Sequence, residues 1–169
     1  MNKTWLFLPL LLLVNALCAQ VGLFDLAYDD PLNTADSLLF KQGFVAAEVE
    51  GSMVKYYTDY NPMVDSVVLF VNPETEIVAG WFVKYNRENT PQQDEYLLER
   101  LHTMHGREVQ IAGAESQLIW GLDKTRSVHA QYTAEGNFCV LYYDSAQDYL
   151  FALPPSVRVE QGAQGQEQR

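Results

Sequence analysis

Cysteine is scarce in this chain, whose 169 residues include only Cys18 and Cys139. Cys18 belongs to a leader described below, and removal of that leader leaves no partner for an intramolecular disulfide. Asn-x-Ser/Thr glycosylation acceptors are also absent after residue 19, since the sole match begins at Asn2. Small secreted eukaryotic domains usually depend on disulfides, so both absences favour an exported bacterial protein that is stabilised by its core.

Positive charge is scarce as well. Lys and Arg number 11 against 22 Asp and Glu, which gives a formal net charge of −11. Loss of Lys3 with the leader makes the charge of the remaining chain about −12. This balance argues against nucleic acid and anionic membrane surfaces as partners. Because the acidic residues are scattered, we interpret them mainly as a source of solubility.

Several catalytic motifs are missing. The sequence has no Gly-x-Ser-x-Gly elbow of a serine hydrolase and no glycine-rich phosphate loop, since its 10 glycines are scattered over turns and helix ends. The acidic pair Asp29-Asp30 precedes Pro31, which is typical of a turn. Calcium requires about six to eight oxygen ligands, so this pair alone predicts no cation site. We expect no cofactor.

The first 19 residues resemble a secretory signal peptide. Lys3 precedes an uncharged apolar run over residues 5–14, and small residues follow at Ala16 and Ala19. This order of regions predicts export, with cleavage after Ala19 or, alternatively, after Cys18. The apolar run is too short to span a bilayer. We therefore expect a periplasmic or extracellular location.

The rest of the chain is predicted to form one α+β domain over residues 20–153. No second apolar run of membrane length follows the leader, so we expect no transmembrane segment in the mature chain. The bulky Leu17 before Cys18 disfavours processing as a lipoprotein. Residues 154–169 are polar, rich in Gln and free of aromatic side chains, which predicts a disordered tail.

The first predicted helix begins near residue 33. Asn33 or Thr34 is expected to cap its amino end. Gly43 is expected to end it in a left-handed conformation, which places Phe44 where it packs back on the helix.

The second predicted helix has stronger signals at both ends. Thr90 is expected to cap it, with Pro91 at its first position and Gln93 completing a capping box. Leucines spaced three and four residues apart form an apolar stripe, and Gly106 ends the helix.

Alternating and apolar runs predict the strands. The expected segments are 52–58, 66–71, 76–85, 117–122, 127–133 and 137–143, with 147–153 as a final strand or edge segment. Short connections indicate antiparallel pairing. We predict an α+β fold with a single mainly antiparallel sheet of about six or seven strands and two helices packed on one face. Each helix precedes a run of strands, which hints at two similar halves.

Five short motifs underlie a resemblance to a known architecture. They are Lys41-Gln42-Gly43-Phe44, the hairpin around Trp81, His105-Gly106-Arg107, Trp120, and Tyr142-Tyr143-Asp144. Over residues 22–145 the chain resembles small uncharacterised bacterial periplasmic domains, similar in architecture to the repeats of β-lactamase inhibitor protein. The resemblance implies a helix-plus-antiparallel-sheet fold and supplies no catalytic residue.

Glu99, His102 and His105 form the candidate metal site. Steps of three residues place neighbouring side chains on adjacent parts of a helix surface, where two of them can share a metal ion. The alternative is that two histidines at a helix carboxyl end interact with the negative end of the helix dipole. We favour that alternative, because Glu99 and His105 point well apart around the helix axis.

Cys139 and His129 form a second candidate pair, as a thiol nucleophile and its base on neighbouring strands. Cys139 lies within Phe-Cys-Val-Leu-Tyr-Tyr, where a buried and therefore inert thiol is expected. We interpret it as a core residue.

Aromatic side chains on strands offer the candidate binding surface. With helices on one face of the sheet, the other face is available to a protein or carbohydrate. Cross-strand packing is the structural alternative. The candidate binding residues are Tyr56, Trp81, Tyr85, Trp120 and Tyr132.

The leading hypothesis is a non-catalytic secreted or periplasmic domain that binds an envelope protein or glycan through an open sheet face or an edge strand. The first alternative is a small metal-assisted hydrolase that uses His102 and His105. The second alternative is a structural component of an envelope assembly.

Overall fold

The computed structural model describes residues 20–107, 109–112 and 117–151. The predicted leader and the 154–169 tail lie outside this range. The helices are α1 (Leu32–Lys41), α2 (Pro91–His105) and the short 3₁₀ helices η2 (Leu23–Asp25) and η3 (Ser145–Leu150). The strands are β1 (Val45–Glu50), β2 (Met53–Tyr57), β3 (Val64–Asn72), β4 (Ile77–Tyr85), β5 (Gln110–Ala112), β6 (Gln117–Gly121), β7 (Arg126–Tyr132) and β8 (Phe138–Asp144).

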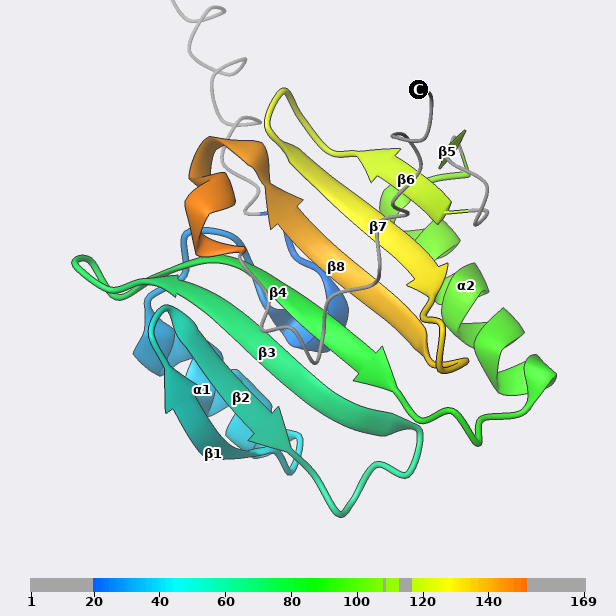
Figure 1. Ribbon diagram of the computed structural model, residues 1–169, viewed down its shortest axis with the longest axis horizontal. Coiled ribbons are helices and arrows are strands. Elements are labelled where there is room, and N and C mark those ends of the chain that lie inside the picture. Colours follow the sequence, from blue (N-terminus) through cyan, green and yellow to red (C-terminus); the bar gives the residue numbers. More distant parts are fainter. Residues whose placement is uncertain (1–19, 108, 113–116, 152–169) are drawn as a thin grey trace, which may run out of the picture.

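The strands form one antiparallel sheet in the order β1-β2-β3-β4-β8-β7-β6-β5 (Figure 1). Each half consists of a helix and a four-stranded meander, and the halves meet where β4 pairs with β8. The α+β prediction is confirmed, with eight strands where six or seven were expected. The additional strands are β1 and β5. The expected final strand over 147–153 is wrong for its described part, because this segment mostly lies in η3.

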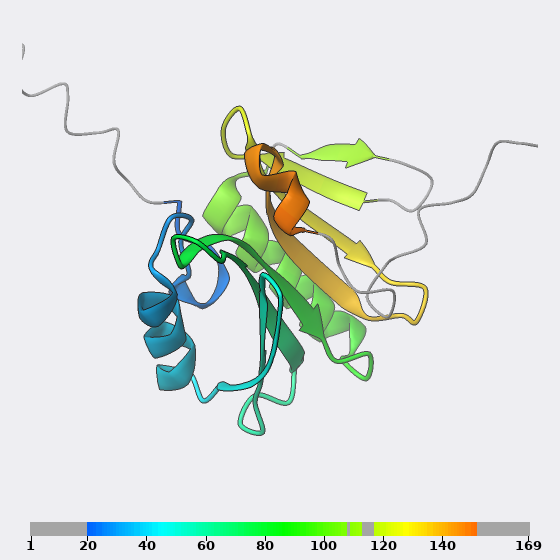
Figure 2. The same ribbon diagram turned by 60° about the vertical axis from the view of Figure 1, so that its left-hand side comes forward.

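Both helices pack against the same face of the sheet, as predicted (Figure 2). Ala35 and Leu39 of α1 and Leu97 and Leu101 of α2 belong to one buried cluster with the inward side chains of the strands. Within the described residues, no helix is long and apolar enough to cross a membrane.

α1 begins two or three residues earlier than expected. Pro31 is its N-cap and makes no side-chain capping bond, so the prediction of Asn33 or Thr34 as cap is wrong. The carboxyl end of α1 agrees with the prediction of a left-handed Gly43 followed by a packed Phe44. Gly43 has φ of 85°, and the N–H of Phe44 donates to the carbonyl of Leu39 at 3.0 Å. Phe44 is buried against the helix end, which is the hydrophobic contact typical of this motif.

α2 begins and ends where its sequence signals predict. The Thr90 hydroxyl accepts a hydrogen bond from the N–H of Gln93 at 3.4 Å, and the Gln93 side chain accepts one from the N–H of Thr90 at 2.7 Å. Gly106 ends the helix with φ of 91°. The helix is therefore fixed at both ends by local interactions, and its leucine stripe faces the sheet.

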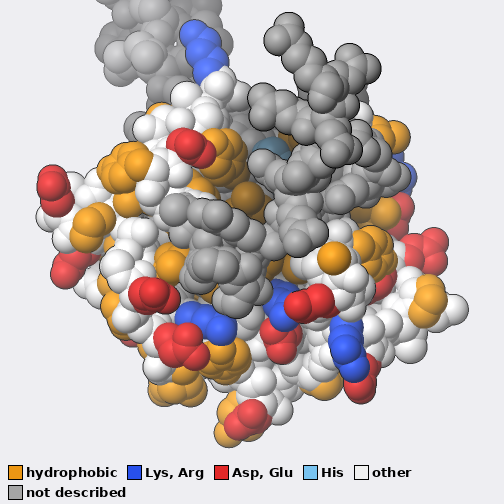
Figure 3. Space-filling view, in the orientation of Figure 1, with side chains coloured by type: hydrophobic (Ala, Val, Ile, Leu, Met, Phe, Trp, Pro, Cys, Tyr) orange, Lys and Arg blue, Asp and Glu red, His pale blue; other side chains and the backbone are white. Residues whose placement is uncertain are grey.

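The second face of the sheet also carries buried apolar side chains. Val68, Phe70, Phe82 and Cys139 form a separate cluster, and the ring of Phe151 lies 4.6 Å from that of Phe70. Figure 3 looks onto this face, and the Lys and Arg side chains in its lower part lie beside Asp and Glu side chains. Strands β3 and β4 are thus buried on both sides.

Candidate functional site

The aromatic side chains that the sequence suggests for binding lie mostly inside the core. Tyr56, Trp81, Tyr85 and Trp120 are at most 3% exposed. They project from the face that the helices cover, so the expected aromatic surface on the open face is wrong for these four residues. The sequence did not reveal which face is covered, because the central strands are apolar on both. Of the five candidate binding residues, only Tyr132 is exposed, and it lies beside α2.

A buried aromatic cluster surrounds Trp81. The ring of Tyr142 stacks on Trp81 with centroids 4.1 Å apart, and Tyr28 packs against both rings. The Tyr142 hydroxyl accepts a hydrogen bond from the N–H of Leu23 at 3.1 Å. Burial raises the pKa of Tyr142, so its hydroxyl stays protonated. This cluster joins the segment before α1 to the centre of the sheet.

The three residues of the candidate metal site contact different partners. Nε2 of His105 lies 2.9 Å from the Tyr142 hydroxyl, whereas Nδ1 of His102 lies 3.3 Å from the carbonyl of Gly106. Glu99 accepts a hydrogen bond from Arg107 at 2.8 Å. Over the described ranges, no group of three or more His, Cys, Asp or Glu side chains is arranged to hold a metal ion.

Cys139 and His129 lie on the same face of neighbouring strands, at diagonal positions. His129 is opposite Leu141 and Cys139 is opposite Gln131. Burial raises the pKa of the Cys139 thiol to about 12, so it stays protonated at neutral pH. The imidazole of His129 contacts the Ser127 hydroxyl at 2.8 Å. Lys84 is opposite Cys139 on β4, but it forms ion pairs with Asp65 and Glu135, so the thiol lacks the net electropositive setting that activates a catalytic cysteine.

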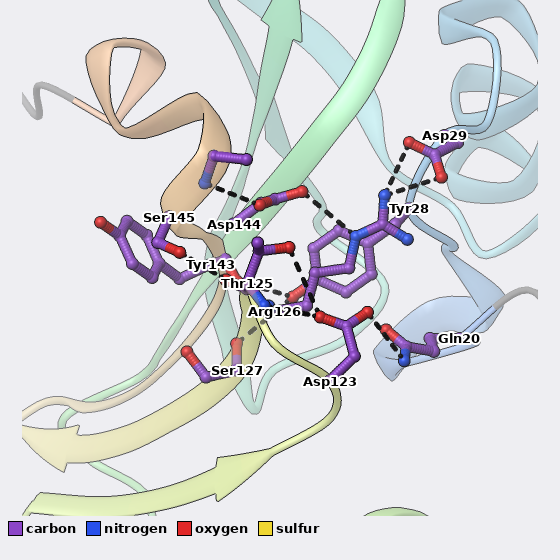
Figure 4. A network of polar contacts seen from close by, with 11 residues as sticks. Gln20, Tyr28, Asp29, Asp123, Thr125, Arg126, Ser127, Tyr143, Asp144 and Ser145 are labelled. Atoms are coloured by element: carbon purple, nitrogen blue, oxygen red, sulfur yellow. Dashed lines mark hydrogen bonds and ion pairs between the residues drawn. The ribbon is translucent and has the colours of Figure 1, made fainter.

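Arg126 is the centre of the polar network in Figure 4. Its Nη2 donates to both carboxylate oxygens of Asp29 at 2.8 and 2.7 Å, and its Nε donates to Asp144 at 3.1 Å. The guanidinium also lies 4.7 Å from the centre of the Tyr28 ring. These contacts join the segment before α1 to the β7–β8 pair. We interpret the network as structural, since Arg126 pairs with two carboxylates from different segments of the chain.

The open edge of β1 is the candidate functional site. β1 pairs with β2 on one side only, and no other backbone hydrogen bond of β1 is formed with the described residues. All six of its residues are exposed, including Val45 at 62% and Val49 at 75%. An edge strand with unpaired N–H and C=O groups is a template for a further strand.

The side chains of β1 divide between the two faces of the sheet. Ala46 is opposite Tyr56 and Val49 is opposite Val54, so both small apolar side chains lie on the helix side. Glu48 is opposite Lys55 and forms an ion pair with it, at 3.9 Å, on the other side. A bulge between Ala46 and Glu48 sets this pattern. The helix side of the edge is therefore apolar, whereas the other side carries Glu48 and Glu50 together with Val45, which is opposite Tyr57.

α1, which precedes β1 in the chain, carries a large exposed apolar side chain. The helix packs beside β1, and Phe40 on its surface is 72% exposed. Exposed apolar side chains next to an unpaired strand are typical of an interaction surface.

Sequence reasoning missed β1 because four of its six residues, in Val-Ala-Ala-Glu-Val-Glu, are Ala or Glu, which are depleted in strands. The available signal was the turn after it. Gly51, with φ of 58°, begins the two-residue connection between the paired residues Glu50 and Met53. A glycine at this position is typical of a tight hairpin turn.

Comparison of the chain with protein-family models, with curated proteins and with solved structures finds no significant match.

Proposed function

We propose that this protein is a non-catalytic binding module that takes up an extended segment of a partner protein at the open edge of β1. The observation that carries the proposal is that all six residues of this unpaired edge strand are exposed. An added strand gains backbone hydrogen bonds along the edge, and its alternate side chains contact the two faces. The second edge strand, β5, has only three residues and offers a shorter template.

The charge of the edge favours a basic partner segment over a second copy of this chain. Glu48 and Glu50 are the only charged residues of β1, and both are acidic. Pairing of two copies brings four carboxylates to one junction, which like-charge repulsion opposes. The formal net charge of −11 adds to this repulsion. A segment with Lys or Arg facing Glu48 and Glu50, and small apolar residues facing Val49, complements the edge.

The test uses a capped synthetic peptide of alternating Lys and Val residues, titrated into the ¹⁵N-labelled protein. Amide shifts are expected to concentrate in β1 and β2. Glu50→Lys is expected to raise Kd about five-fold, as an exposed charge pair of about 1 kcal/mol predicts. Glu74→Lys is the matched control, because Glu74 is exposed in the β3–β4 turn.

Two results would contradict the proposal. In the first, the peptide shifts amides away from β1, or both variants bind it equally. In the second, sedimentation shows a stable dimer, and Glu50→Lys makes the dimer more stable. That result would show that the β1 edge pairs with a second copy of this chain and has a role in assembly.

We propose that residues 1–19 direct export to the periplasm or beyond. The support is the order of a positive residue, an apolar run and small residues ending at Ala19. Amino-terminal sequencing of the protein from a bacterial envelope fraction is expected to begin at Gln20, or at Ala19 for the alternative cut. An intact Met1 would overturn the proposal.

A further inference from the structure

The carboxyl end of the described chain lies beside the hairpin that carries the open edge. The Ser52 hydroxyl, in the turn between β1 and β2, donates a hydrogen bond to the carbonyl of Leu150 at 3.3 Å. The ring of Phe151 packs on Phe70, which is opposite Met53 at the start of β2. The chain therefore leaves the described part of the fold next to the end of β1 that precedes this turn.

The residues that follow are long enough to reach the outside of β1. A strand position outside β1 lies about two strand spacings, or about 10 Å, from the first residue of β2. The four residues 152–155 span up to about 13 Å when extended. Pro154 and Pro155 favour extended backbone and have no N–H to pair, so this part of the sequence suits a connection.

The next five residues match the edge in pattern and in charge. Residues 156–160 are Ser-Val-Arg-Val-Glu, in which polar and apolar side chains alternate as in a strand. After residue 151 the sequence contains the cations Arg158 and Arg169, and only Arg158 has valine on both sides. A positive charge between two valines is the composition that complements the acidic edge of β1.

Antiparallel pairing aligns this pattern with β1. A strand that starts beside the β1–β2 turn and runs back along β1 is antiparallel to it. One register places Val157 opposite Val49, on the helix side of the sheet. The same register places Arg158 opposite Glu48, on the other side. Directly opposite side chains share a face, so an apolar pair and an ion pair form in a single register.

We propose that residues 156–160 add to the open edge of β1 as an intramolecular strand, and that a partner segment must displace them to bind. This regulation rests on the binding function proposed above. Because the segment belongs to the same chain, its effective concentration at the edge is high. The apparent Kd of a partner equals its intrinsic Kd divided by the fraction of molecules whose edge is open.

The test compares the full chain with the variant Val157→Pro/Arg158→Pro. The N–H groups of neighbouring strand residues point to opposite sides, so one of the two prolines removes a donor that would face β1. Hydrogen exchange of the β1 amides that point away from β2 is expected to be at least five-fold faster in the variant. The capped Lys–Val peptide is expected to bind the variant at least five-fold more tightly, with amide shifts in β1.

Arg158→Gln and Arg169→Gln form a matched pair, because each removes one positive charge from the same part of the chain. Arg158→Gln loses the ion pair with Glu48 and is expected to tighten peptide binding about two-fold. Arg169→Gln is expected to leave the Kd unchanged. Equal effects of the two substitutions would show that net charge alone acts, and would overturn the assigned pairing.

Two further results would overturn the proposal. In one, the peptide binds β1 with the same Kd in the proline variant and in the unaltered protein, and exchange of β1 is also the same. Strand addition then stands without regulation by residues 156–160. In the other, protection of β1 rises with protein concentration and sedimentation shows dimers, which would assign these residues to the edge of a second copy. If the peptide binds β1 in neither protein, the function proposed above fails, and this regulation fails with it.

Discussion

At the scale of single residues, Gly22 shows how closely the segment before α1 packs on the sheet. A Cβ at this buried position would lie 2.3 Å from Cε1 of Tyr142 and 2.5 Å from Cζ2 of Trp81. Gly22→Ala is therefore expected to lower the free energy of unfolding by about 2–3 kcal/mol through overpacking. Urea unfolding measures this loss. Gly121→Ala is the control, since no atom lies within 4 Å of its added Cβ, and an equal loss there would contradict the explanation.

His105 makes stability depend on pH. Burial lowers its pKa from the usual 6.5, while its Nε2 contacts the Tyr142 hydroxyl. Below about pH 6.5 His105 takes up a proton in the unfolded chain, whereas in the folded protein it stays neutral to lower pH. Stability is therefore expected to fall as pH falls below this value, and His105 is expected to have no effect on stability above it. His129 contributes with the same sign, because burial lowers its pKa as well.

Urea unfolding at about pH 7.5 and pH 5.5 checks this dependence, and His105→Gln is expected to reduce it. A variant with the full pH dependence of the unaltered chain would show that His105 is not its source.

At the scale of elements, Arg126 connects β7 to two carboxylates of different exposure. The side chain of Asp144 is 5% exposed, whereas that of Asp29 is 61% exposed. Arg126→Ala leaves Asp144 buried without its cation and is expected to cost about 3 kcal/mol. Asp29→Ala removes only the exposed partner and is expected to cost less than about 1 kcal/mol. Thermal or urea unfolding compares the two, and equal losses would contradict this assignment.

Elements with local signals were predictable, and those that depend on distant partners were not. The ends of α2 follow from Thr90, Gln93 and Gly106, which act within a few residues of one another. Four of the six residues of β1 are Ala or Glu, which strands disfavour, and the strand is defined by its pairing with β2. The candidate site was missed for the same reason. The buried aromatics were assigned to the wrong face, because alternation defines two faces without saying which one a helix covers.

At the scale of the whole molecule, one sheet runs through both halves and the inner-face core is continuous across them. We expect a single cooperative urea transition, with far-UV circular dichroism and tryptophan fluorescence giving the same midpoint. Trp81 lies in the first half and Trp120 in the second, so fluorescence reports on both. Two separated transitions would show that the halves fold independently.

The strand order also determines when the protein can fold during its synthesis. Among the described strands, β8 is the last to leave the ribosome, and it lies between β4 and β7. Until residue 144 has emerged, the nascent chain holds two incomplete half-sheets whose inner edges lack their partner. Pairing of β8 with β4 and β7 therefore completes the sheet late in synthesis. A nascent chain that stalls before β8 emerges exposes the unpaired edges of β4 and β7 to chaperones and to other chains.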